Sequence, residues 1–433
     1  MEKIKLDLAT ANRLFYGIGI LVLVVHFFHL SIYLVDIPTM DEWGGASFYP
    51  GLQAPELNWD FIFAPHNMHR IVPTKLQYWL LQHYADLNFA TLALINFFLF
   101  GLLCFGFLQT LERRFGTPMG HFLVVFGTTA MHENHFWGFG GQFHFCLGFY
   151  FLAVHAAVSD SLYRWSSLLW IAAAMLSFGS GVAYAGSLVL LFLCLAWIRR
   201  RPIEYSMLAV TTAIMMGLWF WSGPVARAEF TSPASARFWD YFLNLLASGF
   251  GYTTRDLVPG AAVLLAATGC AAFLAWTLSR EPSKVRSDVA GILTLAVGLI
   301  AGLVSTSIGR AHMNSPKTSR YIELGIFLIP IFWLIVRLAL RGAPRSSGSG
   351  RARLATNLGL IALAIALIVP FASTYDYKSV YKPMFRQKQL TAACVRRYLF
   401  YGGSKNCPIP YQRDITKHMD AAKQAGLLYT EKP

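Results

Sequence analysis

Long apolar runs separated by short polar stretches make up most of the chain. Runs of about 20 apolar residues predict helices that span a bilayer, and the alternating ten-residue strands of a membrane barrel are absent from the sequence. We therefore expect an all-α polytopic integral membrane protein with about eleven transmembrane helices, because helices satisfy their own backbone polar groups in lipid. The segments lie near residues 14–35, 89–111, 119–131, 143–158, 165–177, 187–198, 206–222, 258–278, 289–308, 321–338 and 354–371.

Several of these segments are shorter than a bilayer requires. Those near 119–131 and 165–198 are expected to be tilted, paired with a neighbour or broken at Gly-rich stretches such as Gly179–Ser180–Gly181. The helix boundaries are therefore the least certain part of this pattern.

The composition agrees with a membrane protein. Of the 433 residues, 55% are hydrophobic and only 13% are charged, and the mean hydropathy is +0.47. The net charge of +14 raises nucleic acid as a partner, but the basic residues fall mostly at helix ends, where membrane lipid explains them better. The N-terminal apolar run is too long for a cleavable signal peptide, and no small-residue cleavage site follows it.

The basic residues also predict an orientation. Loops on the N-terminal side of the predicted helices hold about twice as many Lys and Arg residues as the opposite loops. The positive-inside rule therefore places the N-terminus in the cytoplasm. With an odd number of helices, Asp41, Arg70 and the C-terminal tail lie outside, which is the periplasm if the membrane is the inner membrane of a Gram-negative bacterium.

The first outer loop covers residues 36–88. One helical face of residues 74–86 is apolar, which predicts a helix lying in the membrane interface. The alternative is that this stretch is the extended start of the next membrane helix. The members of the apolar face are Leu76, Trp79, Leu80 and Tyr84.

Two domains are expected, a transmembrane domain over residues 1–371 and a small basic tail over residues 372–433. Cys394 and Cys407 lie in the tail, and an oxidising compartment predicts a disulfide between them, the alternative being two free thiols. Two short helices are expected in the tail, near 385–400 and 413–425.

Asp41 and Glu42 are candidate catalytic residues. They stand just beyond the end of the first predicted helix, at the bilayer surface. A carboxylate there can take a proton from an acceptor hydroxyl while a lipid-linked donor lies beside it in the membrane. The alternative is a solvated loop carboxylate that positions Trp43 at the interface.

Two groups of basic residues suit a phosphate. Arg70 lies in the first outer loop, and its planar guanidinium matches phosphate oxygens. The other group gathers in the outer loop at 309–320, against the orientation rule, and lipid head groups are the alternative explanation. We assign phosphate and donor binding to His69, Arg70, Arg310, Lys317, Arg320 and Tyr321.

The second outer loop, residues 131–144, is dense in aromatic and polar groups. Aromatic faces combined with amide and imidazole donors can hold a sugar, and an aromatic belt at the membrane interface is the alternative. A belt does not account for the polar side chains among the rings. We assign sugar or acceptor binding to His66, Glu133, Asn134, His135, Trp137 and Gln142.

Two histidine pairs have a spacing at which metal ligands occur, His66 with His69 and His132 with His135. Neither pair has an obvious set of carboxylates beside it, so hydrogen-bonding histidines are favoured over ligands. We expect no required cofactor, and a divalent metal has no further support.

Four motifs combine these candidates in one order along the chain: Asp41-Glu42-Trp43, His66-Asn67-Met68-His69-Arg70, Asn134 through Trp137-Gly138-Phe139 to Gln142-Phe143, and Ser319-Arg320-Tyr321. Together with the predicted interfacial helix and the many spans, they resemble the membrane glycosyltransferases of the C-type (GT-C) fold, which use polyprenyl-phosphate sugars. Within that superfamily the chain resembles a bacterial branch that includes the type IV pilin arabinofuranosyltransferases. Met68 departs from the motif of the branch, which often has Glu there, and so places more weight on Asp41.

The resemblance implies a GT-C-like fold and transfer of a sugar, arabinofuranose in the pilin enzymes, from a polyprenyl-phosphate donor to a periplasmic protein or cell-surface glycan. It implies Asp41 as the general base with Glu42 beside it, and Arg70 and Arg320 at the phosphate. A transporter or flippase for a polyprenyl-linked glycan is the alternative from another class, and a glycan polymerase or ligase is a third. Apart from Glu323, no acidic residue falls clearly within a predicted span, which argues against an ion-coupled transporter.

Overall fold

Helices form almost all of the regular structure in the part of the chain that the computed structural model describes. That part comprises residues 8–43, 51–52, 54–66, 69–85, 87–222, 230–252, 257–278, 282–313, 319–342, 350–401, 407 and 419–420. An isolated antiparallel bridge between His66 and His69 is the other regular pairing among these residues. The α-helices and short 3₁₀ helices (η) are, in order, α1 (Leu8–Tyr33), η1 (Met40–Trp43), α3 (Trp59–Phe63), α4 (Val72–Tyr84), α5 (Phe89–Phe115), η2 (Gly120–Phe122), α6 (Leu123–Phe126), η3 (Thr129–Met131), α7 (His132–His135), η4 (Gly138–Gly140), α8 (Gly141–Ala157), η5 (Leu162–Trp165), α9 (Ser166–Met175), α10 (Ser180–Ile198), α11 (Pro202–Ser222), α12 (Ala236–Gly249), α13 (Leu257–Leu278), α14 (Ser283–Arg310), η6 (Ala311–Met313), α15 (Ser319–Ile326), α16 (Leu328–Gly342), α17 (Gly350–Ile368), η7 (Val369–Tyr375) and α18 (Tyr377–Tyr401).

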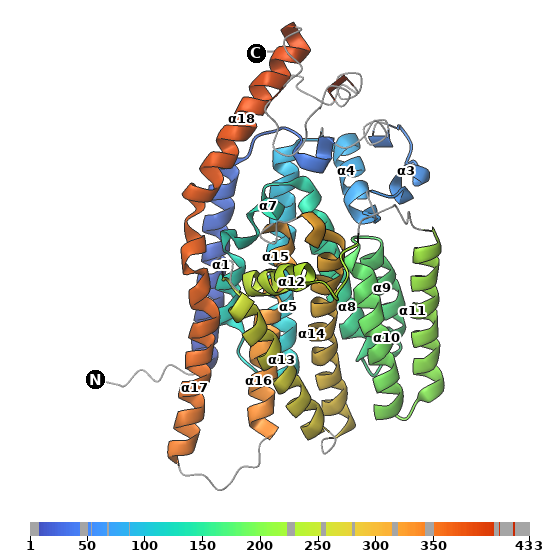
Figure 1. The fold of residues 1–433 in the computed structure, drawn as a ribbon, viewed down its shortest axis with the longest axis vertical. Helices are drawn as coiled ribbons and strands as arrows, with labels where there is room; N and C mark the ends of the chain where they lie inside the picture. The colour runs from blue at the N-terminus through green and yellow to red at the C-terminus, as the bar shows by residue number, and fades with distance from the viewer. Residues whose placement is uncertain are drawn as a thin grey trace, which may run out of the picture.

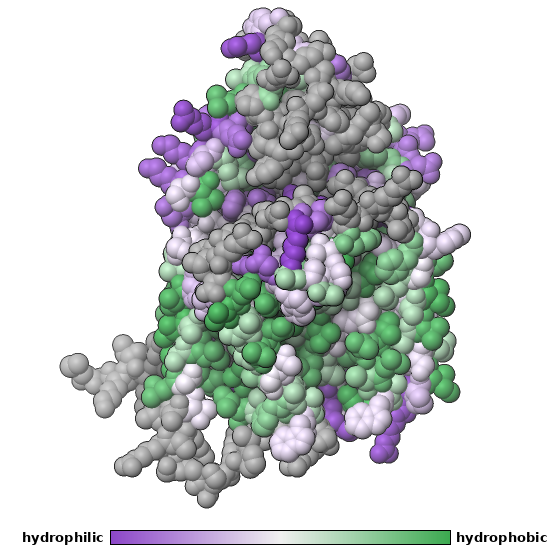
Figure 2. All heavy atoms as spheres, in the orientation of Figure 1, coloured by the Kyte–Doolittle hydropathy of each residue, from purple (hydrophilic) through white to green (hydrophobic). Residues whose placement is uncertain are grey.

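Eight stretches of helix, counted over the described residues, are long and apolar enough to cross a membrane. Most of them run roughly parallel in one bundle (Figure 1), and on the face drawn in Figure 2 hydrophobic side chains cover most of the lower part, with hydrophilic ones gathered above. The chain is therefore an α-helical multi-pass membrane protein. The eight are Ala9–Tyr33, Phe89–Phe115, Ser180–Ile198, Pro202–Ser222, Leu257–Trp276, Ser283–Arg310, Ser319–Leu340 and Thr356–Tyr375.

Three of the predicted segments do not form long helices. Residues 119–131 are divided among η2, α6 and η3, whereas 143–158 and 165–177 correspond to the shorter helices α8 and α9, of 17 and 10 residues. The predicted break near Gly179–Ser180–Gly181 is confirmed, because α10 begins there as a helix separate from α9. The total of eleven spans stays a prediction.

The broken stretch 119–131 follows α1 along its length. Asn12 Oδ1 accepts a hydrogen bond from Gly120 N (2.9 Å), and His26 Nδ1 lies 3.0 Å from Gly127 O, so the stretch runs for about 21 Å beside the helix. A Cβ at Gly127 would lie 2.4 Å from Val22 Cγ1. Close packing against α1, which an apolar pattern does not reveal, accounts for the irregular path.

The helix α12 lies across the bundle rather than along it (Figure 1). Its buried residues include Phe238, Tyr241, Phe242 and Leu245, at the spacing of one face of a helix. Ser235 caps its N-terminus by accepting a hydrogen bond from Phe238 N (3.3 Å). The apolar-run pattern predicts no helix here, because only one face of α12 is apolar.

The helix predicted over 74–86 is present as α4, and of its predicted apolar face only Trp79 is buried within the protein. Leu80 and Tyr84 of the predicted apolar face are 44% and 78% exposed, whereas Lys75 and Tyr78 are buried. Lys75 Nζ donates to the carbonyl oxygens of Phe61 and Ala64, at 2.8 and 2.7 Å. Polar side chains of α4 are thus buried because the preceding loop supplies their partners.

The helices α17 and α18 follow one another in a long rod on one side of the molecule (Figure 1), and α18 contacts α1. The tail helix predicted over 385–400 is part of the longer α18, and the one predicted over 413–425 lies outside the described residues except for 419–420. Cys394 and Cys407 are joined in a disulfide, with an S–S distance of 2.02 Å.

Candidate functional site

The stretches that the sequence singled out for chemistry meet at one end of the bundle, where Figure 1 shows α4, α7 and α15. A hydrogen bond from Gly138 N to Glu42 joins η4 to η1, and one from Asn134 to the Arg320 carbonyl joins α7 to α15. We call this region the loop end; it is formed by η1, α4, α7, η4 and α15. Segments distant in sequence are therefore held together there by polar contacts.

Glu42 lies at the buried centre of the loop end, with 1% of its surface exposed. Its Oε2 accepts from Thr39 N (2.6 Å), and its Oε1 accepts from Gly138 N (2.9 Å) and from the Tyr78 hydroxyl. Donors from three parts of the chain thus hold one carboxylate. These contacts favour an anchoring role for Glu42, in which it ties η1 to α4 and η4.

Glycine is required at position 138 because the backbone there lies very close to the side chains of Tyr78 and Glu42. A Cβ at this position would lie 2.3 Å from the Tyr78 hydroxyl oxygen and 2.5 Å from Glu42 Oε1. The carbonyl oxygen of Gly138 also accepts from Asn96 Nδ2 of α5 (2.5 Å). The backbone of η4 is therefore clamped between a carboxylate and an amide.

Lys388 of α18 is buried beside the same carboxylate. Its Nζ donates to the Phe136 carbonyl (2.9 Å) and lies 4.3 Å from the centre of the Phe136 ring. Burial raises the pKa of Glu42 to about 7, and the positive charge of Lys388 opposes part of that rise. Burial likewise lowers the pKa of Lys388 to about 8, opposed by Glu42 and Asp36. The tail helix thus contributes a charge to the interior of the loop end.

Glu323 is a second buried carboxylate, and it organises the other half of the loop end. Its Oε1 lies 2.7 Å from His144 Nδ1, and its Oε2 accepts from Asn134 Nδ2 (2.6 Å). The same amide nitrogen donates to the Arg320 carbonyl (2.9 Å). Glu323 therefore connects α15 to α7 and α8.

Arginine and aromatic side chains gather next to this network. The guanidinium carbon of Arg320 lies 5.8 Å from the ring centre of Trp137 and 5.3 Å from that of Tyr321. Tyr241 of α12 belongs to the same group, because burial and the nearby Tyr321 raise its pKa while Arg310 and Arg320 act to lower it. Two predicted phosphate-binding arginines are thus close enough to act on one hydroxyl.

Glu133 adds a carboxylate to this group. Its backbone N donates to Ser319 Oγ (3.1 Å), and its negative charge also acts on Tyr241. Its Oε2 is buried and has no hydrogen-bond partner among the described residues. Unlike Glu42, this carboxylate keeps an acceptor that a bound hydroxyl group can use.

The histidines and arginine of the first loop lie against the same region. His69 Nε2 is 3.1 Å from Gln142 Oε1, and His66 and His69 exchange two backbone hydrogen bonds, of 2.7 and 3.2 Å. Arg70 donates to the carbonyl oxygens of Phe63 in α3 (3.0 Å) and Ser222 in α11 (2.7 Å). Part of the hydrogen-bonding capacity of Arg70 is therefore used within the protein.

Three predicted site residues are placed differently or not described. Asp41 belongs to η1, but its side chain lies outside the described part of the structure, and so does all of Lys317. His135 is fully buried, with its ring 4.9 Å from that of Phe97 and 5.0 Å from that of His26. Because aromatic rings of α1 and α5 surround it, His135 is a core residue, which does not fit its predicted contact with sugar or acceptor.

The two histidine pairs do not form a larger group of metal ligands in the described ranges. The ring centres of His66 and His69 are 6.5 Å apart, and His132 Nδ1 lies 3.0 Å from the Thr129 carbonyl. No set of three or more His, Cys, Asp or Glu residues that could hold a metal ion occurs among the residues that the structure describes.

Four residues in or beside the loop end were not among the predicted site residues. Tyr78 and Glu323 belong to the loop end, and Tyr241 of α12 and Lys388 of α18 lie against it. Glu323 could have been predicted from the sequence, because an acidic residue at the start of a membrane span needs a partner. No such signal marks Lys388 or Tyr78, whose partners are contributed by distant segments.

The fold and the loop end define the class: an all-helical multi-pass membrane protein with a network of buried charges and an arginine–aromatic cluster at one end of its bundle. Comparison with protein-family models, with curated proteins and with solved structures finds no match. What the protein does is therefore argued from its residues alone.

Proposed function

We propose that the protein is a membrane glycosyltransferase that moves a sugar from a polyprenyl-phosphate donor to an acceptor hydroxyl. The observation that supports this proposal is the contact of Arg320 with the rings of Trp137 and Tyr321 at the end of an apolar bundle, beside Glu133, whose backbone bonds to Ser319. A lipid-linked sugar phosphate consists of an apolar chain, a phosphate anion and a sugar. The apolar bundle suits the chain, the arginines suit the phosphate, and the aromatic and carboxylate side chains suit the sugar.

Each group has a role in the proposed reaction. The planar guanidinium of Arg320, which lies 5.8 and 5.3 Å from the ring centres of Trp137 and Tyr321, binds phosphate oxygens while the two rings contact the sugar. Asp41 takes the proton of the acceptor hydroxyl, and Glu42 fixes the η1 backbone that carries Asp41. Glu133 positions a sugar or acceptor hydroxyl through its buried Oε2.

The chemistry is a displacement at the anomeric carbon. The acceptor oxygen forms a bond to that carbon as its proton passes to Asp41. The bond between the anomeric carbon and the phosphate oxygen breaks, and the electron pair leaves with polyprenyl phosphate. Arg320 and Arg310 stabilise the charge that develops on the departing phosphate.

In this proposal the chain lies in a bacterial inner membrane, with the loop end facing the periplasm. The acceptor is a periplasmic protein, such as a pilin, or a cell-surface glycan, and arabinofuranose is the first sugar to test. A transporter or flippase for a lipid-linked glycan would use the same arginines but needs no proton acceptor. The release of free polyprenyl phosphate during turnover distinguishes transfer from transport.

The test is a transfer assay with purified protein and a panel of radiolabelled polyprenyl-phosphate sugars. We expect Asp41→Asn to lower the rate by about 10²–10⁴-fold, since that is the usual contribution of a general base. Arg320→Ala is expected to weaken binding of the donor and of free polyprenyl phosphate. The matched control is Asp60→Asn, an exposed acidic residue of the same loop.

Two outcomes count against the proposal. An Asp41→Asn variant with the wild-type rate removes Asp41 as the base, and Glu133→Gln then tests the other carboxylate. If both variants are fully active, neither carboxylate is the general base. If lipid-linked sugar crosses vesicles without release of polyprenyl phosphate, the protein is a transporter and the transferase proposal is wrong.

A further inference from the structure

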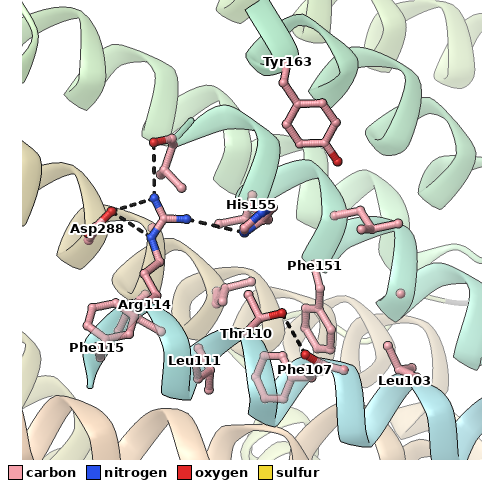
Figure 3. A pocket seen from close by; sticks show the side chains of 18 of the residues that line it. Leu103, Phe107, Thr110, Leu111, Arg114, Phe115, Phe151, His155, Tyr163 and Asp288 are labelled. Atoms are coloured by element: carbon pink, nitrogen blue, oxygen red, sulfur yellow. Dashed lines mark hydrogen bonds and ion pairs between the residues drawn. The ribbon is translucent and has the colours of Figure 1, made fainter. Parts of the chain in front are cut away.

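A second feature lies at the opposite end of the bundle from the loop end. A cavity of about 460 Å³ opens between α5, α8 and α14, within the usual size range of ligand sites. Leu103, Phe107 and Phe151 are among the apolar side chains of its wall (Figure 3). Leu102 and Leu152, which also line it, are 53% and 38% exposed, so the cavity opens on the apolar surface of the bundle.

One end of this crevice is polar. Arg114 Nε and Nη2 lie 2.7 and 2.6 Å from Asp288 Oδ1, and Nη2 also donates to the Val158 carbonyl (3.2 Å). Arg114 Nη1 lies 3.4 Å from His155 Nδ1, on the side of the guanidinium where Figure 3 also shows Tyr163. The guanidinium is therefore held from one side while its other side faces the crevice.

The donors on that side suit a phosphate group. Nη1 is the arginine nitrogen with the longest contact, and the Tyr163 hydroxyl makes no hydrogen bond to any residue in the described ranges. Arginine and histidine donors are typical of phosphate recognition, and basic pockets between membrane helices bind lipid head groups. Tyr163 lies next to the histidine, with its ring centre 6.4 Å from that of His155.

We propose that this crevice binds one glycerophospholipid of the surrounding bilayer, with an acyl chain along α5 and α8 and its phosphate at Arg114, His155 and Tyr163. The site is distinct from the loop end, because Asn96 and Arg114 on the same helix α5 are about 27 Å apart. The proposal of a bound phospholipid does not depend on whether the protein is a glycosyltransferase.

Asp288 determines which lipids bind. It cancels the charge of Arg114, so recognition depends on hydrogen-bond geometry rather than on net charge. Zwitterionic phosphatidylethanolamine and anionic phosphatidylglycerol therefore bind with similar affinity. Diacylglycerol with the same chains lacks the phosphate and binds about tenfold more weakly, as expected for the loss of the hydrogen bonds to that group.

The experiment is native mass spectrometry of the full chain, delipidated in detergent and titrated with each lipid. We expect one tightly retained phospholipid per chain, weak retention of diacylglycerol and none of glycerol phosphate, which has no acyl chain. Equal retention of diacylglycerol overturns phosphate recognition. Retention of glycerol phosphate alone overturns a lipid as the occupant.

Two variants locate the lipid. Gly106 lines the crevice, and a Cβ there meets no atom within 4 Å, so Gly106→Leu fills the space without a clash. Gly217→Leu on α11 is the matched control, because its Cβ also meets nothing and it does not line the crevice. Gly106→Leu is expected to lower retention about tenfold and Gly217→Leu to leave it unchanged.

Equal retention by the two glycine variants would place the lipid elsewhere. Tyr163→Phe removes a single exposed hydroxyl with little risk to folding, and it is expected to weaken phospholipid but not diacylglycerol. An equal effect on both lipids would show that Tyr163 does not contact the phosphate.

Discussion

At the scale of single residues, the acidic side chains of the loop end differ in what surrounds them. Glu42 and Glu323 are enclosed by donors from several segments, whereas Glu133 keeps a buried oxygen without a partner in the described part of the chain. Buried carboxylates in one region of the protein can therefore have separate roles.

The buried carboxyl of Glu42 makes stability depend on pH. Its pKa of about 7 lies above the ordinary 4.5, so between these values the folded protein binds more protons than the unfolded chain. The free energy of unfolding therefore falls as pH rises through this window, by on the order of 3 kcal/mol. In Glu42→Gln this contribution is absent, so the stability of wild type relative to the variant should decline from pH 5 to pH 7.

Thermal unfolding in detergent at several pH values measures this difference. Lys388 faces Glu42 from α18, and its pKa of about 8 keeps it mostly charged in the wild type through this window, so the slope is assigned to Glu42. The control is Glu56→Gln, an exposed position. A difference that stays flat or increases with pH contradicts a raised pKa at Glu42.

At the scale of helices, hydrophobic periodicity predicted the long spans but not the short elements around the site. The spans near 89–111 and 289–308 are confirmed as α5 and α14, because a helix surrounded by lipid and apolar neighbours needs little else from its sequence. The path of 119–131 and the buried face of α4 depend on contacts with α1 and the first loop. Contacts of this kind cannot be predicted from the local pattern of apolar and polar residues.

The connection of α15 to α7 and α8 through Glu323 predicts a large effect of removing its carboxylate. Glu323→Ala leaves His144 and Asn134 without their partner in the interior, and we expect a loss of about 3–5 kcal/mol of stability. Glu323→Gln should lose less, because the amide can still accept from Asn134.

Thermal unfolding of the two variants, with Asp60→Ala as an exposed control, tests this connection. If Glu323→Ala unfolds at the wild-type temperature, the buried contacts do not hold these helices together. If Glu323→Gln is as damaging as Glu323→Ala, the charge itself is needed by His144.

At the scale of the whole molecule, the direction of the loop end decides whether the proposed donor and acceptor can reach it. We propose that this end lies outside the cytoplasm, as the positive-inside rule predicts from the sequence. A cysteine at Glu56 should therefore react with a membrane-impermeant maleimide on intact spheroplasts, and one at Arg113 only after lysis. The reverse pattern would exclude a periplasmic acceptor.

This labelling is done in a background in which Cys104, Cys146, Cys194 and Cys270 are replaced, since they are free thiols. Glu56 is exposed beyond α1, and Arg113 is exposed in the last turn of α5, near the opposite end of the bundle. The two positions therefore report on the two sides without lying in the loop end or in the lipid crevice.

Several residues of the candidate site could be predicted because they are polar or aromatic residues of short motifs in the predicted outer loops. Asn134, Arg320 and Gln142 were predicted from residue type and are found in the same region. The sequence could not show that Gln142 is buried and bonded to His69, that His135 belongs to the core, or that Lys388 reaches the loop end. These facts depend on packing between segments that are separated by about 40 to 250 residues in the sequence.

The contact of Lys388 with Phe136 has a consequence for biosynthesis. Lys388 is translated about 250 residues after the carbonyl that it caps and more than 300 after the carboxyl beside it. The membrane helices that precede α18 are therefore inserted before Lys388 is available to bond with the Phe136 carbonyl. The contacts of the loop end can be completed only after α18 has been translated, and a nascent protein that stops short of α18 lacks them.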